Sequence, residues 1–123
     1  MKSKNLANLI AQLILEKKGY NVTLMDMRSV TTMTDFFVIC SADSDIQVKA
    51  IMEHIREQLL FQAIKPWHVE GLTSMTWLLI DFVDVVVHIF QPETRAFYTL
   101  EKLWGDAKIT QVKDTLSALP PSQ

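Results

Sequence analysis

Apolar and polar residues follow two different periods along this chain. Near the amino terminus, apolar residues recur every three or four positions, which predicts a helix that stops at Gly19. The apolar positions of this helix are Leu6, Leu9, Ile10, Leu13 and Ile14. Segments 22–27 and 35–40 are short apolar runs that predict strands, and the second is apolar enough to be buried on both faces. A second helix follows and is expected to end before Pro66.

The rest of the chain completes a mixed pattern of strands and helices. The further predicted elements are strands over 67–70, 76–82 and 85–90 and a helix over 94–104. The order α-β-β-α-β-β-β-α predicts an α/β fold, a small two-layer sandwich in which helices flank a mixed β-sheet. We expect one domain over residues 1–107 and a C-terminal tail over 108–123, whose proline-containing end frays.

The two strands before the last helix carry the most informative pattern. A two-residue loop at Val83-Asp84 places six apolar side chains on one face of the strand pair, which we expect to be the core face. The opposite face then carries Trp77, Leu79, Asp81, Val86, His88 and Phe90. Large apolar residues mixed with ionisable ones are typical of a protein-binding surface. The alternative is that a helix covers this face and that Asp81 pairs with His88.

Charge is distributed unevenly along the sequence. The whole chain carries a net charge of −2, but residues 70–106 hold two basic and six acidic residues, a net charge of −4. The predicted binding face lies in this segment, so we expect a basic protein partner and no direct DNA binding. Carboxylates scattered over a solvated surface are the alternative. No apolar run approaches the roughly 20 residues that cross a bilayer, so we expect a cytoplasmic protein without membrane contact.

The predicted last helix has two different faces. The residues expected on its core side are Phe97, Leu100 and Trp104. Tyr98 and Glu101 lie on the other side, where Tyr98 is either an interface anchor or an ordinary surface tyrosine. Arg95 is expected to pair with a nearby carboxylate.

Few residues are placed to carry out catalysis or to bind a metal. The single cysteine, Cys40, lies inside an apolar strand, where the role of a small buried hydrophobic residue is expected. A metal site at the hairpin would need His88 with Asp81 and Asp84, which form no ligand motif. We therefore predict no metal site here.

Asp43 and Asp45 form an Asp-x-Asp pair, a spacing also used to hold Mg²⁺ for nucleotidyl transfer. Helix capping by Ser44 or Asp45 explains the same residues. The chain has only three glycines and no glycine-rich phosphate loop, so a triphosphate site is hard to build here and we predict no cofactor. The alternative is a Mg²⁺-dependent nucleotidyltransferase that uses Asp43, Asp45 and Asp81.

Several stretches, taken together, resemble the ribosomal silencing factor family, also called the iojap-like family. The stretches are Asp35-Phe36-Phe37-Val38-Ile39, Glu70-Gly71, Trp77-Leu78-Leu79-Ile80-Asp81, Asp84-Val85-Val86-Val87-His88-Ile89-Phe90 and Arg95-x-Phe97-Tyr98-x-Leu100-Glu101-x-Leu103-Trp104. Their order and spacing extend over residues 4–107. Each stretch is weak evidence alone, and the series is specific.

The resemblance implies a nucleotidyltransferase-like fold that lacks catalytic residues. It implies binding to the large ribosomal subunit through an L14-type ribosomal protein, which blocks joining of the small subunit and represses translation. It also implies a homodimer and, in organellar relatives, a role in subunit maturation. The partner contact is implied near the Trp77 strand and Tyr98. The candidate contact residues are Trp77, Leu79, Asp81, His88, Arg95, Tyr98 and Glu101.

Two positions depart from the family pattern. Ser41-Ala42 replaces a Ser-Gly step after the second strand, which argues further against a phosphate loop. Val83 replaces the glycine that precedes the hairpin aspartate. A β-branched residue resists the positive φ of a tight type I′ turn, so a longer loop or a bulge could change the register of the hairpin.

Overall fold

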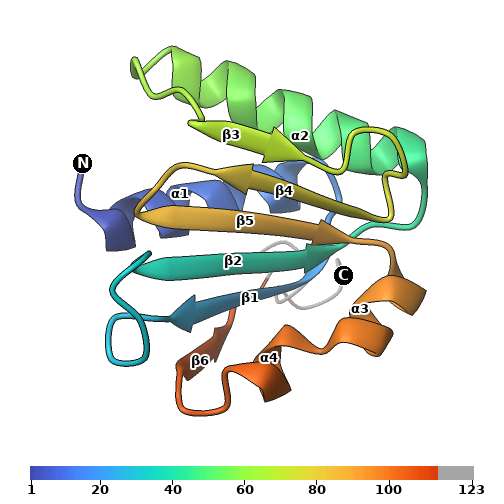
Figure 1. Ribbon diagram of the computed structural model, residues 1–123. Helices are drawn as coiled ribbons and strands as arrows, with labels where there is room; N and C mark the ends of the chain where they lie inside the picture. Colours follow the sequence, from blue (N-terminus) through green and yellow to red (C-terminus); the bar gives the residue numbers. More distant parts are fainter. Residues whose placement is uncertain (114–123) are drawn as a thin grey trace, which may run out of the picture.

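The computed structural model describes residues 1–113 of the chain. Its elements are α1 (Ser3–Glu16), β1 (Tyr20–Asp26), β2 (Phe36–Ser41), α2 (Asp45–Leu60), β3 (His68–Glu70), β4 (Trp77–Asp81), β5 (Val85–Phe90), α3 (Pro92–Tyr98), α4 (Leu100–Leu103) and β6 (Lys108–Gln111). The strands form one sheet in the order β3-β4-β5-β2-β1-β6 (Figure 1). The pairing of β2 with β5 is parallel and the other described pairings are antiparallel, which confirms a mixed sheet in an α/β fold.

The main core lies between one face of the sheet and the helices α1 and α2. The predicted apolar stripe of α1 packs there, with Ile10 and Ile14 fully buried. The β4 and β5 residues expected on the core face, such as Leu78 and Ile89, are also fully buried. Each such side chain contributes roughly 1.5–3 kcal/mol relative to an exposed one. In Figure 1, α1 passes behind the sheet, whereas α3 and α4 lie near the end of β5 and beside β6.

The predicted register of the β4–β5 hairpin is confirmed. Leu78 pairs with Ile89 and Ile80 pairs with Val87, and the Phe82 amide donates to the Val85 carbonyl at 2.8 Å. The loop is the two-residue Val83-Asp84 step. Val83 takes a φ of 73° despite its branched side chain, and the Asp84 amide donates back to the Phe82 carbonyl at 3.0 Å. The turn therefore keeps the short register at the cost of strain at Val83.

Gly71 allows β3 and β4 to approach each other closely. Its φ is +91°, and a Cβ atom there would lie 2.1 Å from the carbonyl oxygen of Trp77. Any other residue at this position would push the start of β4 away. The Glu70-Gly71 pair thus serves to place Trp77.

The predicted helix over 94–104 is interrupted. Thr99 has a left-handed backbone, with φ 38° and ψ 64°, and it separates α3 from α4. The change of direction at Thr99 breaks the helical spacing on which the prediction for Phe97 rested. Leu100 is buried, but Phe97 is 80% exposed, so its predicted place in the core was wrong.

β6 was not predicted, because residues 108–111 were placed in the C-terminal tail. These four residues are all exposed and show no alternation of apolar and polar positions. They pair with the outer edge of β1, where Met25 lies opposite Ile109. The predicted fraying of 117–123 lies outside the described residues.

Replacing Val83 with glycine is expected to stabilise the protein. Glycine adopts a positive φ without steric cost, so Val83→Gly should raise the free energy of unfolding by about 1 kcal/mol after the entropy of a more flexible unfolded chain is subtracted. Urea denaturation measures this change. Val83→Ala is the control, since its Cβ retains part of the strain and its gain should be smaller. A destabilised Val83→Gly variant would show that the turn is not strained.

Candidate protein-binding surface

The face of β4 and β5 opposite the main core is half covered. A second, smaller core occupies the part nearest β1 and β2. Its buried members are Met25, Met27, Ile39, Phe90, Leu100 and Ala107, with Trp104 packed against them. Towards β4 the cover ends, and Trp77, Leu79 and Asp81 remain half-buried. The prediction of an open face therefore holds for β4, while the alternative of a covering helix holds for the neighbouring strands.

Aromatic rings connect the small core to the surface. Trp77 stacks on Phe90, with 4.9 Å between ring centroids, and packs against Tyr98 at 4.7 Å. Tyr98 in turn contacts Phe97 at 5.0 Å. Tyr98 is 48% exposed and Phe97 80%. We call Trp77, Phe97 and Tyr98 the aromatic surface; Phe97 is a member that the sequence analysis missed.

Buried His88 is the most unusual polar residue of this face. It is only 4% exposed, so its expected place on an open surface was wrong. Asp81 is not its partner. The Trp77 indole Nε1 donates to His88 Nδ1 at 3.1 Å, and burial lowers the pKa of His88 to about 3. The ring is therefore neutral at pH 7.

A groove of about 530 Å³ opens beside His88. Its lining residues are Thr31, Met33, Thr34, Phe37, Trp67, Leu79, Asp81, Val83, Val86, His88 and Trp104. The candidate residues Leu79, Asp81 and His88 are thus brought together in one depression. Met33, Thr34 and Trp67 were missed, because the loops that bring them here pack on the sheet only in the folded chain.

Backbone hydrogen bonds fix the two loops that border the groove. The Trp67 amide donates to the Asp81 carbonyl at 2.8 Å, and the Asp35 amide donates to the Asp84 carbonyl at 2.9 Å. Asp81 Oδ1 accepts from the Val83 amide at 2.7 Å. The hairpin turn therefore holds both borders of the groove in place.

Arg95 and Glu101 anchor α3 and α4 to the sheet. Arg95 donates to the Asn21 carbonyl at 2.7 Å and to Ser41 Oγ at 2.9 Å. It also donates to Thr23 Oγ1 at 3.1 Å and to Glu101 Oε2 at 3.4 Å. The predicted pairing of Arg95 with a carboxylate is confirmed. Because α3 contributes no buried side chain of its own among its described residues, these bonds set the position of Tyr98.

The residues suggested for nucleotidyl transfer do not converge. The Tyr20 hydroxyl bonds Asp43, Gln91 donates to Asp45 at 2.6 Å, and Ser44 Oγ caps α2 by accepting from the Gln47 amide at 3.1 Å. Asp81 lies at the opposite end of the sheet, about 13 Å or more away at 3.3 Å per strand residue, since it pairs with Val86 while the loop to Asp43 follows the Phe90 end. Among residues 1–113, no three His, Cys, Asp or Glu side chains are grouped to hold a metal ion.

Cys40 behaves as the small buried residue that was predicted. It is fully buried, and burial raises the pKa of its thiol to about 12. A thiol in this state is not a nucleophile at pH 7.

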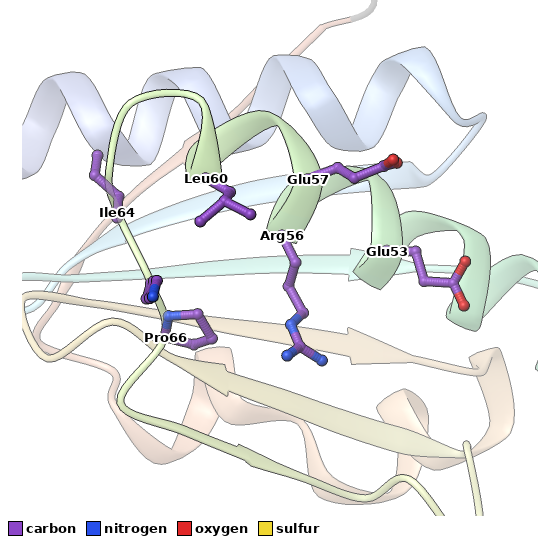
Figure 2. A pocket seen from close by; sticks show the side chains of 7 residues that line it. Glu53, Arg56, Glu57, Leu60, Ile64 and Pro66 are labelled. Carbon is purple, nitrogen blue, oxygen red and sulfur yellow. The ribbon is translucent and has the colours of Figure 1, made fainter.

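A second hollow, of about 610 Å³, lies between the end of α2 and the segment that follows it (Figure 2). Figure 2 shows Arg56 extending from α2 towards the strands, to the right of Pro66. Charged residues of both signs line the hollow, and within the described part of the chain it contains no buried polar atom that lacks a partner. The groove beside His88 is therefore the better candidate for a binding site.

Comparison with known proteins identifies the family. The sequence profile described as "Ribosomal silencing factor during starvation" matches residues 1–122. This chain belongs to the ribosomal silencing factor family. A ribosomal silencing factor of Halalkalibacterium halodurans is 37% identical over 117 residues, which cover 95% of this chain and 100% of that relative.

Other members of the family agree in fold and differ in length. A crystal structure of a protein from Chromobacterium violaceum has a TM-score of 0.82 and 28% identity, and covers 93% of this chain and 95% of that one. A mouse protein named mitochondrial assembly of ribosomal large subunit protein 1 is 28% identical over 102 residues, 79% of this chain and 44% of that protein. None of the helices described here is long and apolar enough to span a bilayer.

Burial of neutral His88 predicts a stability loss in acid. The unfolded chain binds a proton at His88 near pH 6.5, whereas the folded chain does so near pH 3. This contribution to stability is therefore complete above pH 6.5 and is lost as the pH falls, by up to about 1.4 kcal/mol per pH unit. Urea denaturation at pH 7, 5 and 4 should show a smaller loss for His88→Phe than for the wild type. Equal losses in both proteins would contradict a buried neutral histidine.

Proposed function

We propose that this protein represses translation by occupying the large ribosomal subunit, through an L14-type ribosomal protein, so that the small subunit cannot join. Membership of the ribosomal silencing factor family supports a role on the ribosome. The mouse relative's name refers to the large subunit, which favours that subunit as the partner. The observation that carries the proposal is the aromatic surface, with Tyr98 and Phe97 exposed, beside the groove of about 530 Å³.

The residues of this surface suit a protein partner with a basic contact region. Trp77 and Tyr98 offer large areas to bury, and tyrosine adds a hydroxyl at little cost in side-chain entropy. Residues 70–106, which contain both, carry a net charge of −4. Such a charge steers a basic surface towards the aromatic contact and disfavours bare phosphate.

In this proposal the seven candidate residues have different tasks, and His88 positions Trp77 by accepting its indole N–H. Trp77, Tyr98 and Leu79 make apolar contact, and Asp81 supplies negative charge at the groove. Arg95 and Glu101 act through position, because their bonds fix α3 where Tyr98 meets Trp77. The protein acts by steric exclusion in the cytoplasm and carries out no reaction.

Truncating the aromatic surface is expected to weaken binding to large subunits. Trp77→Ala and Tyr98→Ala should each cost about 2 kcal/mol, roughly thirtyfold in affinity, because they remove central anchors. Co-sedimentation with purified large subunits measures the effect, and mixing both subunits on a sucrose gradient shows whether joining is restored. Phe61→Ala is the matched control, since Phe61 is 84% exposed but follows α2, outside the aromatic surface.

Two measurements test the binding protein, one against a different contact surface and one against the nucleotidyltransferase alternative. If both variants sediment with large subunits as the wild type does, the aromatic surface is not the contact. For the enzyme alternative, calorimetry with Mg²⁺ and ATP is decisive: micromolar binding that is lost in Asp43→Asn would favour a nucleotidyltransferase over the binding protein.

We further propose that two copies associate as a homodimer. Phe97 and Leu103 are 80% and 70% exposed, an unusual amount of apolar surface for a lone domain. Light scattering over a range of concentrations should show a mass that rises towards twice that of the chain, and Phe97→Ala should reduce it. A constant monomer mass would rule the homodimer out.

A further inference from the structure

Two buried polar atoms at the groove have no hydrogen-bond partner among residues 1–113: His88 Nε2 and Thr34 Oγ1. His88 is 4% exposed and Thr34 7%. A third such atom, Glu101 Oε1, belongs to a residue that does not line the groove. Leaving a buried polar group unpaired is unfavourable, so two of them in one depression indicate a ligand that satisfies both.

The hydrogen bond from Trp77 determines what His88 offers. An indole Nε1 can only donate, so His88 Nδ1 must be the acceptor in that bond. A neutral imidazole carries one proton, which then resides on Nε2. His88 therefore presents an N–H donor to the groove, and the missing partner must supply an acceptor oxygen or nitrogen.

The charge of the groove narrows the choice of acceptor. Asp81 also lines it, and Asp81 Oδ1 already accepts from the Val83 amide. An anionic acceptor such as a carboxylate or phosphate would be repelled by Asp81. A neutral main-chain carbonyl is not repelled, and a neighbouring lysine or arginine of the same segment would be attracted to Asp81.

We propose that the groove binds a loop of a basic large-subunit protein, whose main-chain carbonyl accepts from His88 Nε2 and whose backbone also bonds Thr34 Oγ1. The inference rests on the proposed function and names the hydrogen-bonding groups through which the groove recognises the bound loop. Apolar side chains such as Met33 and Trp67, which are 85% and 75% exposed, then close over the bound loop.

A second copy of this chain is a poorer occupant of the groove than a basic loop. A two-fold dimer places the same patch of both copies in contact. In a two-fold dimer through the groove, the Asp81 carboxylates of both copies would lie in one interface, and like charges oppose that arrangement. A basic loop gains from the same charge.

Isosteric removal of the unpaired groups tests the inference. Thr34→Val deletes only the unpaired hydroxyl, whereas His88→Phe deletes the Nε2 donor together with the Nδ1 acceptor of Trp77, so Thr34→Val is the cleaner variant. Thr32→Val is the matched control on an exposed threonine two residues away. Binding of fluorescently labelled chain to purified large subunits is measured by anisotropy, and urea denaturation reports folding. We expect about tenfold weaker binding for Thr34→Val and His88→Phe, unchanged binding for Thr32→Val, and no loss of stability in Thr34→Val.

The outcomes distinguish this inference from the proposed function. If Trp77→Ala loses binding while folded Thr34→Val and His88→Phe bind as the wild type does, the inference fails and the proposed function stands. If the wild type does not bind large subunits, the proposed function itself fails. If Thr34→Val leaves subunit binding intact but lowers the mass of the free chain, a second copy fills the groove and the inference is overturned. Should His88→Phe not fold, Thr34→Val decides.

Discussion

The register of β4 against β5 is the constraint on which the rest of this structure depends. A shift of one residue would turn Trp77 and His88 into the main core and bring Leu78 and Ile89 to the surface. The two-residue turn prevents that shift, although Val83 must adopt a φ of 73°. The same turn fixes the loops around the groove, because the Asp81 and Asp84 carbonyls accept from the Trp67 and Asp35 amides. One strained turn therefore sets both the core and the binding surface.

The helices on the surface side are held by polar bonds more than by burial. α3 has no buried residue among those described, and Arg95 attaches it to Asn21, Thr23 and Ser41 on β1 and β2. The break at Thr99 then lets α4 turn Leu100 into the small core while Tyr98 stays beside Trp77. This arrangement leaves the aromatic surface exposed without loosening the sheet beneath it.

Sequence reasoning succeeded where a local period determines the structure. The stripe of α1 and the alternation in β4 and β5 follow from spacing alone, so the core face and the residues opposite it could be predicted. Thr99 was not predictable in the same way, because a threonine takes a left-handed conformation only when tertiary contacts enforce it. β6 lacks an apolar pattern and forms because β1 offers a free edge. Thr34 and Trp67 reach the groove through loops, which no period describes.

Backbone strain and unpaired buried polar atoms occur together at the groove, which supports a binding role for this surface. Val83 is strained, and His88 and Thr34 hold buried atoms without partners. All three line the same groove, whereas the buried main-core face of the sheet has no such defect among its described side chains. A valine in place of Thr34 would pack nearly the same volume without an unpaired hydroxyl. The groove thus lowers the stability of the free chain, and a bound partner that supplies hydrogen bonds to His88 and Thr34 would recover part of that stability.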